Sequence, residues 1–157
     1  MKEENKKSIE FTKEQFLVLM KTVYLGNWMA NANRDGSPEY PHIKEYEVIE
    51  DYIFSLAPQF GFEKYMDHEP RYGDRYFPTG LFEEEIDVNK LHDEYDEETF
   101  WDELSERLGE RDFFKKYSKK DLEKMTKDER YIKSIECEIA WEEELENNGI
   151  ERLGIIK

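Results

Sequence analysis

The sequence of 157 residues carries a formal charge of −16, from 39 acidic side chains against 23 Lys and Arg. This balance argues against direct binding of nucleic acid, which needs clustered basic side chains. The single cysteine excludes an internal disulfide, and no apolar run approaches the ~18 residues of a membrane-spanning helix. We therefore expect a soluble, cytoplasmic chain with one helical domain at residues 11–157, after a flexible leader at residues 1–10.

Two helices are predicted in the first third of the chain. Thr12 and Gln15 have the spacing of a capping box, in which each side chain bonds to the backbone N–H of the other residue. The apolar spacing that follows predicts a helix ending at the turn signal of residues 33–36. A second helix is expected over residues 42–57, because Pro58 disfavours the helical conformation for the residue before it.

Residues 58–82 are rich in aromatic residues, proline and glycine, and we expect them to form a long irregular connection folded over the helices. Arg and Tyr are enriched in binding hot spots, and function concentrates on loops. One hypothesis is a loop site at residues 65–82 that binds a small anion or covers the site of a metal-dependent enzyme. A purely structural aromatic loop is the alternative. The candidate side chains of this loop site are His68, Arg71, Tyr72, Arg75 and Tyr76.

The acidic side chains concentrate in residues 83–112, which hold fourteen carboxylates against three bases. Phe100, Leu104 and Leu108 occur there at helical spacing, so we predict a helix over residues 97–112 with Asp96 as its N-cap. We expect the three apolar side chains to be buried and the carboxylates to form a solvated face that attracts a basic partner. The candidate interaction surface consists of Glu97, Glu98, Asp102, Glu103, Glu106 and Glu110.

The remaining sequence predicts a short helix after Ser118 and a longer one after Thr126, each beginning at a capping position. Asn148-Gly149 should end the longer helix, and residues 153–156 are expected to form a short strand or an extended end. Residues 113–133 form a basic island with a net charge of +4. It either neutralises neighbouring carboxylates or polarises the surface.

No motif predicts catalysis, a metal site or a cofactor. His42, His68 and His92 are the only histidines, and none lies in a complete metal-binding motif. Cys137 lies between two glutamates, which disfavour a reactive thiolate. No glycine-rich phosphate loop is present. We leave catalytic residues unassigned and predict no cofactor.

Two segments resemble a pattern of small, uncharacterised bacterial proteins. They are residues 95–112, from Tyr95-Asp-Glu-Glu to Glu-Arg-Asp112, and residues 140–153, from Ala140-Trp-Glu-Glu to Glu-Arg-Leu153. The resemblance implies a bacterial source and a small compact domain, with no activity attached.

The sequence as a whole predicts an all-α or mostly α fold with about four main helices. We expect a non-catalytic module that binds a basic protein surface, as an adaptor, a toxin-neutralising protein or a nucleic-acid mimic. A metal-dependent enzyme or small-anion binder using the loop site is the alternative. The oligomeric state is left open.

Overall fold

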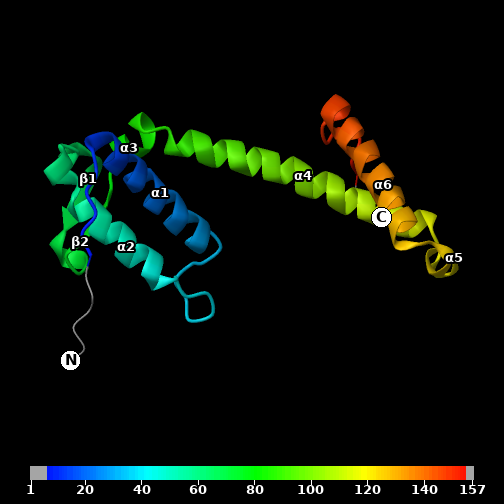
Figure 1. Cartoon of the computed structure of the whole chain (residues 1–157), viewed down its shortest axis with the longest axis horizontal. Coiled ribbons are helices and arrows are strands. Elements are labelled where there is room, and N and C mark those ends of the chain that lie inside the picture. Colours follow the sequence, from blue (N-terminus) through cyan, green and yellow to red (C-terminus); the bar gives the residue numbers. More distant parts are fainter. Residues whose placement is uncertain (1–6, 155–157) are drawn as a thin grey trace. The chain divides into compact units, whose positions relative to one another are not determined.

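The computed structural model describes residues 7–154, except for the side chain of Tyr72. The chain is mostly helical, as predicted, and the four helices of at least seven residues are α1 Lys13–Asn31, α2 Lys44–Ser55, α4 Val88–Lys116 and α6 Lys127–Asn148 (Figure 1). Two short helices, α3 Gly80–Glu85 and α5 Lys119–Lys124, complete the α-helices in the described range, and three short 3-10 helices lie within residues 57–72.

The chain divides into two compact units, the first ending at His92 and the second beginning at Asp93. Helix α4 begins in the first unit and continues into the second. Each unit is described by itself below. The single domain over residues 11–157 stays a prediction.

The first unit begins as the sequence predicts. Thr12 caps α1 and exchanges hydrogen bonds with Gln15, which confirms the capping box. Helix α2 lies within the predicted range and ends before Pro58, with Leu56 as its C-cap. The N-cap of α2 is Ile43, which has no side-chain acceptor, but its backbone N–H donates to Asn31 Oδ1 at 2.7 Å.

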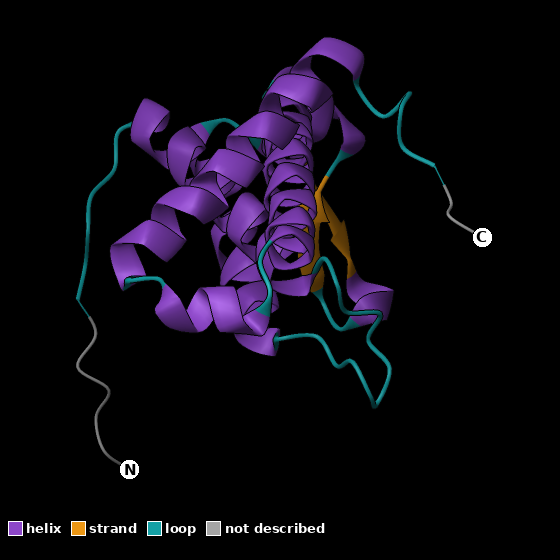
Figure 2. Cartoon of the chain, turned by 90° about the vertical axis from the view of Figure 1, so that its right-hand side faces the viewer, coloured by secondary structure: helices purple, strands orange, loops and turns teal. Residues whose placement is uncertain are grey.

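The irregular connection contains a β-hairpin that the sequence analysis missed. Strands β1 Met66–Glu69 and β2 Arg75–Pro78 pair antiparallel, with His68 opposite Tyr76 (Figure 2). Each strand has only four residues, so the alternation of side chains is too short to stand out. Asp51 of α2 holds the hairpin, because its carboxylate accepts hydrogen bonds from the Tyr76 backbone N–H at 2.5 Å and from Arg75 Nε at 3.1 Å.

Aromatic rings from the connection fill the core of the first unit, as expected. Phe54 and Phe82 are fully buried edge to face, and Phe62 and Tyr65 pack with them. Phe60 stacks on Phe16 of α1 with ring centroids 3.9 Å apart. Large rings bury much apolar area per residue, so this core needs few members.

The predicted start of the acidic helix at Asp96 is wrong. Helix α4 already begins at Val88 and runs without interruption to Lys116, so Asp96 is an interior residue. Residues 88–95 lack both glycine and proline, and nothing in them breaks the helix.

The later helix boundaries are confirmed. Ser118 and Thr126 cap α5 and α6 through capping boxes with Asp121 and Glu129. Gly149 follows α6 and has a positive φ, a backbone conformation that glycine adopts readily and that is common at the end of a helix. The predicted extended end over residues 153–156 lies partly outside the described residues, as does most of the predicted leader.

Candidate functional site

In the second unit, the backbones of α4 and α6 lie in close contact at Gly109. A Cβ atom added to Gly109 would lie 2.7 Å from the Cα of Glu138 and 2.8 Å from its backbone nitrogen. Ser105 and Phe113, one turn to either side, are buried. The missing side chain of Gly109 is what lets the two backbones approach.

This packing overturns the predicted burial of the Phe100, Leu104 and Leu108 face. Phe100 is 50% exposed, and Leu104 and Leu108 are only half-buried. At 100° per residue, these positions lie on the side of α4 away from the row of Ser105, Gly109 and Phe113. A small side chain allows closer helix contact than leucine, so the row of Ser105 and Gly109 faces α6 and the leucines do not.

The six carboxylates of the predicted interaction surface are all exposed, but they lie around α4 and not on one face. Glu106 and Glu110 line a groove with α6, and Asp102 lines a second depression beside Glu142. Glu97 and Glu98 lie in the first part of this unit's α4 segment, beside other acids. Glu103 accepts two hydrogen bonds from Arg107, at 2.8 and 2.9 Å.

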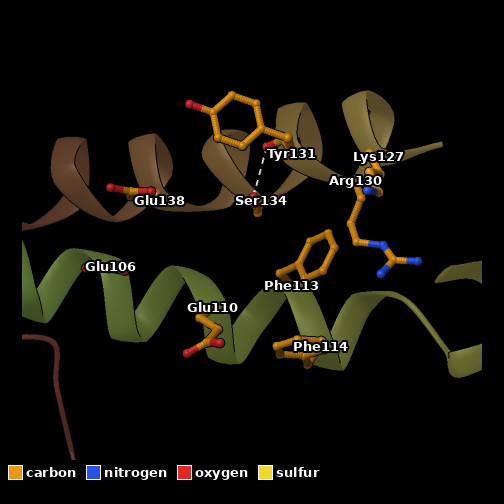
Figure 3. Close-up of a pocket in the computed structure, with 9 residues that line it drawn as sticks. All are labelled: Glu106, Glu110, Phe113, Phe114, Lys127, Arg130, Tyr131, Ser134 and Glu138. Carbon is orange, nitrogen blue, oxygen red and sulfur yellow. Dashed lines mark hydrogen bonds between the residues drawn. The ribbon is translucent and has the colours of Figure 1, made fainter. Parts of the chain in front are cut away.

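The groove between α4 and α6 combines aromatic rings with charge (Figure 3). Its volume is about 390 Å³. Phe113 is buried at its base, whereas Phe114 and Tyr131 are 58% and 67% exposed. The lining residues are Glu106, Glu110, Phe113 and Phe114 from α4, with Lys127, Arg130, Tyr131, Ser134 and Glu138 from α6.

The basic and acidic side chains that α6 contributes to this groove lie at different places along its length. Lys127 and Arg130 lie at the end where α6 begins, and Glu138 lies two to three turns further along α6. Arg130 already donates to the backbone oxygen of Leu122 at 2.6 Å. Within the described part of the chain, Glu106, Glu110 and Glu138 form no ion pair, although Lys127 and Arg130 line the same groove.

A polar cluster of Arg111, Asp112 and Trp141 joins α6 to α4. Asp112 accepts hydrogen bonds from Trp141 Nε1 at 2.9 Å and from Arg111 Nε at 2.8 Å. The guanidinium also lies 5.3 Å from the centre of the Trp141 ring. The Arg111 hydrogen bonds are the main cause that lowers the pKa of Asp112 to about 2.

The side chains of the predicted loop site serve the β-hairpin. His68 bonds to Asp74 at 2.5 Å and stacks on Tyr76 with ring centroids 4.3 Å apart. Arg75 Nε donates a hydrogen bond to Asp51, and Arg71 is exposed. Nothing is described of the Tyr72 side chain. These contacts account for three of the four described side chains, and the loop site stays a prediction.

The described residues contain no group of three or more His, Cys, Asp or Glu side chains positioned to hold a metal ion. His42 bonds to Glu47 at 2.8 Å and to the backbone oxygen of Arg34 at 3.1 Å, which closes the turn between α1 and α2. None of the helices in the described range is long and apolar enough to cross a lipid bilayer.

A buried carboxylate that the sequence analysis missed lies in the first unit. Glu50 of α2 is 6% exposed and accepts a hydrogen bond from Asn27 Nδ2 of α1 at 2.8 Å. Burial raises its pKa to about 7, although Asn27 and Arg75 favour the charged form. In sequence, a glutamate in an acidic helix gives no sign of such burial.

No family model, curated protein or solved structure matches the chain. The resemblance of residues 95–112 and 140–153 to small uncharacterised bacterial proteins therefore stays a prediction.

Proposed function

We propose that this chain is a protein-binding module and that the groove between α4 and α6 receives a basic segment of a partner protein. The observation that carries the proposal is the combination of exposed rings with carboxylates that form no ion pair within the described residues. Phe114 and Tyr131 offer apolar contact, and Glu106, Glu110 and Glu138 offer negative charge around it. A cationic segment bearing one large apolar side chain matches both features.

The two features have different roles. The acidic surface raises the rate of encounter with a basic partner, an effect that salt weakens. The aromatic side chains supply the contact area that slows dissociation. An adaptor or toxin-neutralising protein in the cytoplasm uses this chemistry, and a nucleic-acid mimic would bind the same kind of basic surface.

The test uses a fluorescent amphipathic peptide made of leucine and lysine, and its leucine–glutamate counterpart as a negative probe. Anisotropy is measured with the full chain over a salt series. We expect binding of the lysine peptide only, with an affinity that falls as salt rises. Glu106→Gln, Glu110→Gln and Glu138→Gln combined should weaken it roughly tenfold, because exposed ion pairs contribute up to ~1 kcal/mol each.

A matched control separates the groove from overall charge. Glu45→Gln, Glu63→Gln and Glu84→Gln combined remove the same three charges from exposed positions of the first unit. This variant should bind the peptide as the unchanged chain does. An equal loss in both triple variants, or an affinity indifferent to salt, would contradict a specific electrostatic groove.

A further inference from the structure

One face of α4, on a different side from Gly109, carries acidic, apolar and basic side chains in an order that is complementary to itself when reversed. Its residues follow one another at spacings of four, three, four, four, three and four, which keeps them on one side of a helix. The two acids come first, three apolar residues follow, and the two bases come last. The stripe consists of Asp93, Glu97, Phe100, Leu104, Leu108, Arg111 and Lys115.

The stripe is largely exposed within the described residues of the second unit, although Leu104 and Leu108 are half-buried and Arg111 lies near the Trp141 ring of α6. The contact with α6 uses Gly109, on the other side of α4. Phe100 is half exposed, and the side chain of Lys115 is 62% exposed. Helix α4 is continuous through the whole stripe, so its residues form one straight row along about six turns.

We propose that the stripe binds the same stripe of a second copy, antiparallel, with the two-fold axis passing at Leu104. In that arrangement Leu104 meets its own counterpart and Phe100 meets Leu108. Glu97 meets Arg111, and Asp93 meets Lys115. The Leu104 contact lies on the axis and occurs once, and each of the other three contacts occurs twice, as a two-fold interface requires.

Charge complementarity selects the second copy over other occupants. A purely basic helix would meet attraction at Asp93 and Glu97 but repulsion at Arg111 and Lys115. A parallel second copy would place like charges together at both ends. Only an antiparallel partner with the same order of charges satisfies both ends and covers the apolar centre.

The existing contacts of the stripe do not prevent this pairing. Arg111 bonds to Asp112, and Glu97 accepts from Trp101 Nε1 at 2.7 Å. Arg111 also lies 5.3 Å from the centre of the Trp141 ring of α6, and Lys115 Nζ lies 3.6 Å from Asp112 Oδ1. Arg111, Lys115 and Glu97 are nevertheless exposed residues, and ion pairs at exposed positions contribute little and can be shared with a partner. The proposed dimer interface uses a different side of α4 from the groove around Phe113. Its test is therefore independent of the test of the proposed function.

Cysteine cross-linking tests the geometry directly. In a Cys137→Ser background, the full chain carries one new cysteine, and a short bifunctional maleimide is added. Leu104→Cys should cross-link to itself. Glu97→Cys and Arg111→Cys should not cross-link alone but should do so when mixed. Self-cross-linking at Glu97→Cys would indicate a parallel pair, and the absence of any cross-link would overturn the proposal.

Charge exchange tests the selection of the partner. Sedimentation equilibrium should give a dimer for the unchanged chain, and circular dichroism should show that every variant keeps its helix content. Asp93→Lys with Glu97→Lys, and Arg111→Glu with Lys115→Glu, should each weaken self-association at least tenfold. A one-to-one mixture of the two variants should associate again, as should the chain with all four changes. A monomeric unchanged chain, or dimers unaffected by these changes, would overturn the proposal.

Discussion

At the scale of single residues, Glu50 is the least expected feature of the chain. Ionised carboxylates are rarely buried, because removing them from water costs more than one hydrogen bond returns. Here Asn27 supplies one hydrogen bond, and Asn31 in turn donates to Asn27 Oδ1 at 2.7 Å. Asn31 Oδ1 then accepts the Ile43 N–H at the start of α2. The carboxyl group therefore belongs to a chain of polar contacts that joins α1 to α2.

The raised pKa of Glu50 predicts that stability depends on pH. The folded state keeps a proton that the unfolded state releases between about pH 4.5 and pH 7. Stability should therefore fall as pH rises through this window and become constant above it. The whole loss is at most about 3 kcal/mol, the free energy that corresponds to the raised pKa.

Urea unfolding followed by tryptophan fluorescence across this pH range measures the effect. Glu50→Gln keeps an acceptor for Asn27 without the charge, so it should abolish this contribution to the slope. Glu45→Gln, an exposed change in the same helix, should leave the slope in place. An unchanged slope in Glu50→Gln would show that this carboxyl group is not the cause.

The residues that the sequence did reveal act over short distances. Thr12, Ser118 and Thr126 were recognisable because a cap and its partner are three residues apart in the chain. The burial of Glu50 depends instead on Asn27, which is 23 residues away. No local pattern carries that information.

At the scale of elements, α4 shows how far apolar spacing can mislead. Its most regular stripe, at Phe100, Leu104 and Leu108, is the pattern expected of a buried face. The structure instead packs α4 through Ser105 and Gly109, whose small size permits contact between backbones. Periodicity shows that a face is apolar, but the partner that covers it is decided by contacts far away in the sequence.

Two glycines in helix interiors give a matched test of this packing. A methyl group on Gly26 in α1 would meet no atom within 4 Å, so Gly26→Ala should stabilise the chain by up to ~1 kcal/mol. Gly109→Ala gains the same helix propensity but forces a methyl group into the Glu138 backbone. Overpacking of this kind costs about 1–3 kcal/mol, so the net change should be destabilising.

Amide hydrogen exchange separates the two effects by location. Gly109→Ala should speed exchange in residues 127–148, whereas Gly26→Ala should not. Stabilisation by both substitutions would show that α4 and α6 do not approach each other at Gly109.

The β-hairpin at residues 66–78 is the other element that the sequence did not reveal. Its strands are short, and their position depends on Asp51 in α2. The candidate side chains His68, Arg75 and Tyr76 turned out to serve this hairpin. Arginine and tyrosine in a loop are common in binding sites, but they also pair with acids and stack on rings in structural turns.

At the scale of the whole molecule, the two units differ in how they bury their apolar side chains. The first unit encloses a cluster of aromatic rings around Phe54 and Phe82. Among the described residues of the second unit, only Phe113 and Leu145 of the large apolar side chains are buried, while Phe100, Phe114 and Tyr131 are exposed. Exposed apolar side chains beside charge are characteristic of binding surfaces. We therefore expect the second unit to carry the interactions of this chain.

Hydrogen-exchange mass spectrometry of the full chain, with and without the leucine–lysine peptide, tests this central claim most directly. The account predicts slower exchange at residues 106–114 and 127–138 when the peptide is bound, with no change in residues 7–92. Slower exchange confined to the first unit, or no change at saturating peptide, would contradict it.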